Sequence, residues 1–190
     1  MEILAALLIF ILLFVTGAGA LLWGTHGRLM TLEARCEAAL SDVDVQLKHR
    51  HGLIPNLVET VRGFATHEKS ALEAVTAARA RALSARSDEA RIEAEGALSV
   101  NLGRLLTVVE SYPNLQADRH FQNLSSEIAD CENKIAAARR YHNATVAEYN
   151  ATLGQFPANV IAGRLSLAKR SHYDLGLERM IVEDAPTVKF

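Results

Sequence analysis

The sequence has few of the residues that interrupt helices or build strands. Four prolines and eleven glycines among 190 residues leave long stretches without a helix breaker. Aromatic residues make up 6% of the chain, and no segment shows the alternation of apolar and polar residues that is typical of strands. Alanine, leucine, glutamate and arginine dominate instead, and they favour helix. The composition therefore predicts an all-α protein.

Cysteine and net charge are also scarce. The two cysteines, Cys36 and Cys131, are too few for a disulfide framework or a cysteine-based metal site. We expect both to be buried as small apolar side chains. A disulfide between them is the alternative, and it requires their Cα atoms to lie within about 7 Å. A net charge of −2 gives no indication of a nucleic acid partner.

Patterns that carry catalytic or metal chemistry are missing as well. The chain has no glycine-rich phosphate loop and no Gly-x-Ser-x-Gly turn. None of the seven histidines follows an acidic residue at the spacing of a di-iron site, and His67-Glu68 lacks the second histidine of a zinc protease. We expect no catalytic residues, no cofactor and no metal, and therefore no enzymatic activity.

One long apolar run is present at the start. Residues 3–23, ILAALLIFILLFVTGAGALLW, carry no charge and are long enough to cross a hydrocarbon core of about 30 Å. Trp23 stands at the end of the run, where its ring suits the membrane interface. A cleaved signal peptide is the alternative, but no Lys or Arg precedes the run. We expect residues 1–28 to be a transmembrane anchor and short linker.

The anchor carries a face of small residues that would let two helices approach closely in lipid. Thr16, Ala20 and Gly24 are spaced by four, with Gly17 beside them. Small residues are common in membrane helices, so association through this face is a hypothesis. Arg28 and Arg35 follow the span, and the positive-inside tendency places the large domain in the cytoplasm.

Beyond the anchor the apolar residues recur at steps of three and four, which predicts amphipathic helices. The first should run from Leu29 to Arg50. Pro55 lacks an N–H, so we expect a kink or junction at Gly52 and Pro55, followed by a second helix to Leu83. The stripe consists of Leu29, Leu32, Cys36, Leu40, Val43, Leu47, Ile54, Leu57, Val58, Val61, Ala65, Leu72, Val75 and Ala82.

Two further helices follow. Ser87 should cap a third helix that ends at Tyr112-Pro113. A fourth should run from Ala117 to Leu153, with a stripe that is coiled-coil-like in its period. That stripe consists of Phe121, Leu124, Ile128, Cys131, Ile135, Ala138, His142, Val146, Tyr149, Leu153 and Phe156. We expect residues 29–167 to form an antiparallel helical bundle and residues 168–190 an extended tail.

Basic residues cluster in two places on these helices. Residues 48–51, Lys-His-Arg-His, form one cluster, and the arginines at 79, 81, 86 and 91 form the other. We expect solvated helix faces here, with contact to anionic lipid headgroups as the alternative.

Several segments of the chain resemble the LemA family. They are residues 43–61 (VDVQLKHRHGLIPNLVETV), 110–115 (ESYPNL), 138–143 (ARRYHN), 148–150 (EYN), 156–157 (FP) and the final Pro186, Val188 and Phe190. The chain departs from the family's pattern at Gly52, where an acidic residue is usual, and at His142, where an aromatic residue is usual. The resemblance implies a short membrane anchor carrying a helical bundle, without established enzymatic activity. It also implies links to membrane organisation, including magnetosome compartments, and to envelope stress or proteolysis systems.

These observations predict a single-pass protein of the bacterial cell membrane. Its partners should be the lipid bilayer and further copies of itself, in a structural or scaffold role. The alternative is an adaptor or regulator of another envelope protein, such as a membrane protease. Its tail would then dock through Pro186, Val188 and Phe190.

Overall fold

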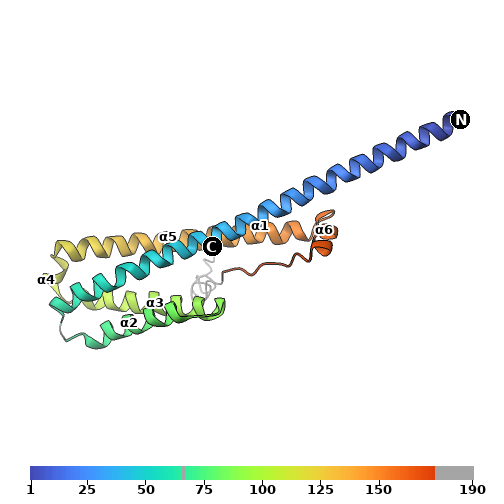
Figure 1. Ribbon diagram of the computed structural model, residues 1–190. Coiled ribbons are helices and arrows are strands. Elements are labelled where there is room, and N and C mark those ends of the chain that lie inside the picture. Colours follow the sequence, from blue (N-terminus) through green and yellow to red (C-terminus); the bar gives the residue numbers. More distant parts are fainter. Residues whose placement is uncertain (66, 174–190) are drawn as a thin grey trace, which may run out of the picture. The chain divides into compact units, whose positions relative to one another are not determined.

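The computed structural model describes residues 1–65 and 67–173, and these contain helices and no strand (Figure 1). The prediction of an all-α protein is confirmed. The helices are α1 (Glu2–Phe64), α2 (Lys69–Ser84), α3 (Asp88–Val109), α4 (Pro113–Gln116), α5 (Arg119–Leu153) and α6 (Ala158–Leu165).

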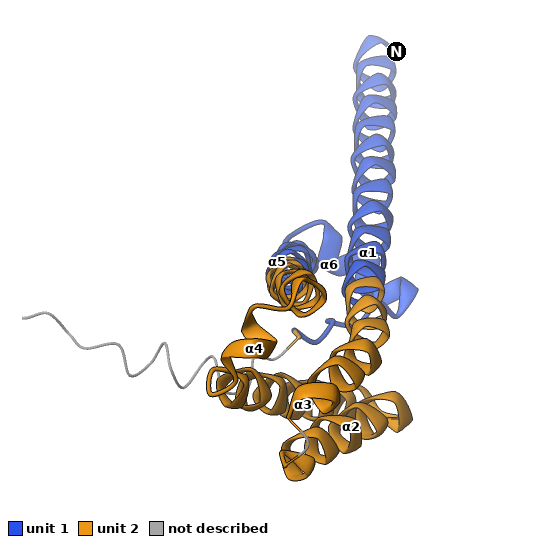
Figure 2. Ribbon diagram, turned by 90° about the vertical axis from the view of Figure 1, so that its left-hand side faces the viewer, with its two compact units in different colours: residues 1–43, 138–172 blue, residues 44–137, 173–190 orange. Residues whose placement is uncertain are grey.

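The chain divides into two compact units (Figure 2). Among the described residues, the first consists of residues 1–43 and 138–172, and the second of residues 44–137 and 173. The long helices α1 and α5 each contribute to both units.

In the first unit, α6 and the end of α5 pack against α1. As α1 runs from Leu29 to Cys36, α5 runs the opposite way from His142 to Leu153 (Figure 1). The buried residues of this core are Leu29, Leu32, Cys36, Val146, Tyr149, Leu153, Ala158 and Ala162. Those of α1 and α5 belong to the predicted apolar stripes, and burial of one face of each helix holds this unit together.

In the second unit, the later part of α1 and the early part of α5 pack with α2, α3 and α4. The predicted stripe residues from Ile54 to Ala82 are buried, and so are those of α5 from Phe121 to Ile135. Ser87 caps α3 as predicted, because its Oγ accepts a hydrogen bond from the backbone N–H of Ala90 at 3.2 Å. α4 is an additional short helix that begins at Pro113, where only a helix end was expected.

The helix junction predicted at Gly52 and Pro55 is wrong, and the kink given as its alternative stays a prediction. α1 continues through both residues to Phe64, and α2 begins at Lys69. Pro55 cannot supply the N–H that would bond to the His51 carbonyl. Arg79 of α2 supplies a donor instead, with its Nε 2.9 Å from that carbonyl oxygen. The predicted helices 29–50 and 54–83 are therefore replaced by α1 and α2.

The predictions for the end of α5 and for the two cysteines are confirmed, and the prediction for Phe156 is wrong. α5 ends at Leu153 as expected, and His142 and Tyr149 are buried on its inner face. Cys36 and Cys131 are both buried and free. Phe156 was expected to continue the buried stripe, but it lies beyond the end of α5 and 83% of its surface is exposed.

Candidate functional sites

The apolar part of α1 is exposed on all sides within the described chain. A stretch of 18 residues in this part of the helix has a mean hydropathy of 2.7, and none of that stretch is buried. The large apolar residues from Ile3 to Trp23 are all exposed. Such a surface is stable only in lipid or against another apolar surface, so this segment is a candidate membrane anchor.

The small-residue face of the anchor is open. A Cβ atom added at Gly17 or Gly24 would meet nothing within 4 Å. The hydroxyl of Thr16 donates within its own helix, to the carbonyl oxygens of Leu12 at 2.9 Å and Leu13 at 3.1 Å. Thr16 therefore needs no partner for its hydrogen bond, and close packing is what this face offers.

A charged cluster lies buried in the second unit, with Arg50 of α1 at its centre. The Arg50 side chain is fully buried. Its Nη1 donates to Glu132 Oε1 at 2.7 Å and to Ser99 Oγ at 2.6 Å, and its Nη2 donates to Glu95 Oε2. The other carboxylate oxygen of Glu95 lies 2.9 Å from His51 Nε2. The cluster thus joins α1, α3 and α5.

The electrostatics of this cluster favour the charged forms. Burial alone would raise the pKa of Glu95, but the hydrogen bond from His51 and the charge of Arg50 outweigh it and lower that pKa. Burial would lower the pKa of Arg50, and Glu132 and Glu95 together raise it instead. The cluster is therefore a buried salt bridge whose members depend on one another.

The solvated face predicted for residues 48–51 is wrong for two of its four members. Arg50 and His51 are buried, whereas Lys48 and His49 are exposed. The spacing contained a signal for this, because Arg50 stands three after Leu47 and four before Ile54. Glu95 likewise continues the stripe of Leu98, Leu102, Leu105 and Val109. Residue type alone predicts only the apolar members of a stripe, whereas spacing includes Arg50 and Glu95 as well.

The histidines and the tail residues singled out in the sequence lie as follows. In residues 1–65 and 67–173 there is no group of three or more His, Cys, Asp and Glu side chains that could hold a metal ion. His51 contacts Glu95, and His67 is exposed. Pro186, Val188 and Phe190 lie outside the described residues.

The chain matches the model of the LemA family over residues 39–190. This chain belongs to the LemA family. The match begins after the candidate anchor and covers the helices that hold the Arg50 cluster.

Four related proteins align with most of this chain. Magnetosome proteins MamQ 1 and MamQ 2 of Paramagnetospirillum magneticum are each 25% identical over 183 residues, covering 83% of this chain and 67% of the relative. MamQ of Magnetospirillum gryphiswaldense is 24% identical, covering 72% and 60%. Protein LemA of Metamycoplasma hominis is 25% identical, covering 83% and 74%. The chain thus spans about two thirds of the length of its magnetosome relatives.

Proposed function

We propose that this chain is a membrane-anchored structural or scaffold protein of the bacterial cell envelope that self-associates and has no enzymatic activity. The observation that carries the proposal is α1 itself. One helix of 63 residues joins the exposed apolar span to the helical core. A single continuous helix gives the anchor and the soluble part a direct mechanical connection.

Self-association is supported by the open small-residue face of the anchor. Thr16, Gly17, Ala20 and Gly24 together leave room for a second helix at close range. The names of the MamQ relatives place those proteins with the magnetosome, which is in line with a role in membrane organisation.

The orientation of the anchor follows from flanking charge. Arg28 and Arg35 lie after the span, and basic residues are enriched on the cytoplasmic side of membranes. We infer that the helical core is cytoplasmic. Labelling of Cys substitutions at Ser70, which is exposed on α2, and at Glu2 with a membrane-impermeant thiol reagent on intact cells tests this. Only the Glu2→Cys chain should react, and reaction of the Ser70→Cys chain alone would reverse the orientation.

Mass measurement in mild detergent tests the scaffold proposal. The full chain should have a mass of two or more copies. This mass should fall on dilution only where detergent replaces the second copy on the surface of the anchor. A strict monomer at every concentration would contradict the proposal.

An adaptor or regulator of another envelope protein, such as a membrane protease, is the second candidate. It is favoured by the way the chain is held just before its tail. Asn150 makes two hydrogen bonds of 2.9 Å with the backbone of Arg170, and Tyr173 is buried. The segment that follows, with Pro186, Val188 and Phe190, would then leave from a fixed point and dock as a strand.

Cross-linking in native membranes separates the two candidates. Full chain and chain lacking residues 185–190 would be compared. Loss of cross-links to a different protein, with cross-links between copies retained, supports the adaptor. If the deletion changes neither kind of cross-link, tail docking is wrong and the scaffold stands.

A further inference from the structure

The first unit exposes a set of apolar side chains at the end of α5 and on α6. Phe156 is 83% exposed, Val160 52% and Leu165 46%. On the opposite face of α6, Ala158 and Ala162 are buried in the core, with Ile161 packed against it. α6 therefore packs one face against the core, while Val160 on the other face and Leu165 at the helix end stay exposed.

This apolar surface lies next to the candidate anchor. The core that holds α6 contains Leu29 and Leu32 of α1. Leu29 lies about 9 Å beyond Trp23 along the helix, at about 1.5 Å per residue. Because α5 runs opposite to α1 in this unit, the turn of residues 154–157 lies at the end of α5 that faces the apolar span (Figure 1).

Basic residues follow the anchor and accompany α6 in the sequence. Arg28, Arg164 and Lys169 are exposed. Arg28 lies 4.0 Å from Glu148 and Arg170 lies 3.1 Å from Glu33, so the charge that we assign to the lipid contact is that of Arg164, on α6 itself. An apolar patch with a basic rim, continuous with a membrane span, matches the chemistry of an anionic membrane interface.

We propose that the turn of residues 154–157 and α6 form a second membrane contact, with Phe156 inserted at the level of the lipid headgroups. The inference rests on the proposed membrane anchor. The contact would fix the rotation of α1 about its own axis, because a span alone leaves that rotation free. α6 and the anchor would then form a two-point attachment of the first unit to an anionic lipid surface.

Depth-dependent fluorescence quenching tests this contact in the full chain. Trp23 is the one tryptophan of the sequence, so Trp23→Phe gives a background without tryptophan fluorescence. Phe156→Trp is added to it, and the protein is reconstituted in phosphatidylcholine vesicles containing phosphatidylglycerol with brominated acyl chains. Tyr141→Trp is the control, because Tyr141 is 55% exposed and lies about 18 Å before the end of α5.

The Phe156→Trp chain should lose most of its fluorescence to bromolipid and be protected from aqueous acrylamide, whereas the Tyr141→Trp chain should behave in the opposite way. Quenching of the Phe156→Trp chain by acrylamide alone would overturn the contact. Protection from both quenchers would also overturn it, because a second copy of the chain would then cover the surface.

The wild-type chain separates this inference from the anchor. Trp23 should be quenched by bromolipid if the anchor is inserted. Quenching at Trp23 without quenching of the Phe156→Trp chain overturns the second contact alone. Absence of quenching at both positions overturns the anchor and the contact together.

A charge reversal tests the basic rim. Arg164→Glu in the Phe156→Trp chain should weaken quenching in vesicles that contain phosphatidylglycerol. Arg140→Glu, an exposed position on α5, is the matched control and should leave quenching unchanged. Equal quenching in the two variants would overturn the role of anionic lipid.

Discussion

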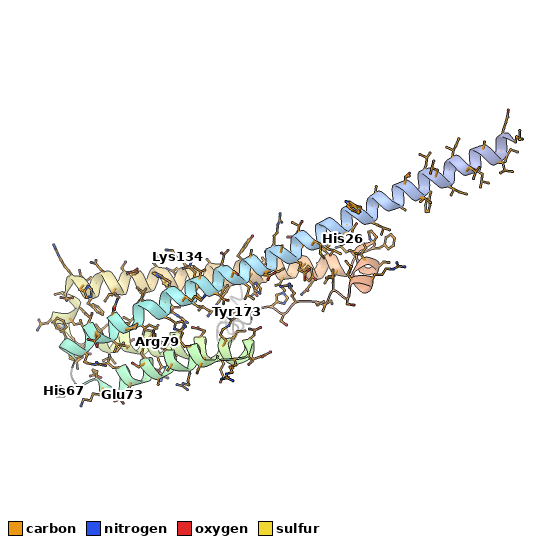
Figure 3. All side chains as sticks on the ribbon, viewed as in Figure 1. His26, His67, Glu73, Arg79, Lys134 and Tyr173 are labelled. Atoms are coloured by element: carbon orange, nitrogen blue, oxygen red, sulfur yellow. The ribbon has the colours of Figure 1, made fainter. Side chains whose placement is uncertain are left out.

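Arg79 donates a hydrogen bond from Nε to the main-chain carbonyl oxygen of His51 at 2.9 Å. In a regular helix that carbonyl would accept from the residue four positions later, which here is Pro55 and has no N–H. Arg79, labelled in Figure 3, therefore replaces a missing backbone donor from the neighbouring helix. This contact gives a partner to the carbonyl that Pro55 leaves without one inside α1.

Removing this donor should destabilise the protein. Arg79→Ala leaves the His51 carbonyl without its partner, and we expect the free energy of unfolding to fall by about 1–3 kcal/mol. Arg81→Ala is the matched control, since Arg81 is exposed on the same helix, and it should change stability by less than about 0.5 kcal/mol. Denaturant unfolding of the full chain in mild detergent, followed by helical circular dichroism, measures both.

A double-mutant cycle tests the mechanism behind that loss. Pro55→Ala restores a backbone N–H within reach of the His51 carbonyl. In the Pro55→Ala background, Arg79→Ala should cost less than it does in the wild type, with a coupling of at least about 0.5 kcal/mol. Equal costs in the two backgrounds would show that Arg79 acts through some other contact.

The buried Arg50 cluster should be sensitive to loss of one partner. Glu95→Gln removes a charge that balances the fully buried Arg50, so we expect a loss of roughly 3 kcal/mol, with Glu132 left as the remaining partner. Glu93→Gln is exposed on the same helix and serves as control. A loss no larger than that of the control would mean that the cluster contributes nothing to stability.

The same cluster predicts an acid limb in the stability curve. The pKa of Glu95 in the folded protein is lowered from its ordinary value of 4.5, so the folded state binds its proton more weakly than the unfolded chain. The stabilisation is complete above pH 4.5 and is lost as the pH falls through the folded-state pKa. Glu95→Gln should flatten this limb, and a limb unchanged in the variant would assign it to other carboxylates.

His142 predicts a second pH dependence, in the first unit. Burial lowers its pKa from 6.5, the charges of His172 and Arg170 lower it further, and a hydrogen bond with the Cys36 backbone opposes them. The unfolded chain therefore binds the proton more tightly, and the free energy of unfolding should decrease as the pH falls below 6.5. His142→Phe should remove this decrease, whereas His120→Phe at an exposed position should retain it.

The apolar run of the candidate anchor, the helical stripes and the Ser87 cap could be predicted from the sequence, because each depends on residues close together in the chain. The continuity of α1 through Pro55 could not be predicted that way. Arg79, which supplies the donor that Pro55 lacks, belongs to another helix and becomes a neighbour only after folding.

The Arg50 cluster was missed for a related reason. A charged residue at a stripe position is unfavourable when considered alone. Arg50 becomes acceptable only when Glu95 and Glu132 arrive from α3 and α5. The exposure of Phe156 also depended on the fold, because α5 stops at Leu153 and the chain turns before α6.

The most direct test of the account is resonance energy transfer between donor-labelled and acceptor-labelled full chains in vesicles, comparing Ala20→Leu with Ala18→Leu. The two substitutions are chemically identical, but they lie on opposite sides of the anchor, since successive helical residues are rotated by about 100°. We predict that wild type and Ala18→Leu show transfer that Ala20→Leu loses. Equal transfer in both variants, or none in the wild type, would contradict self-association through this face.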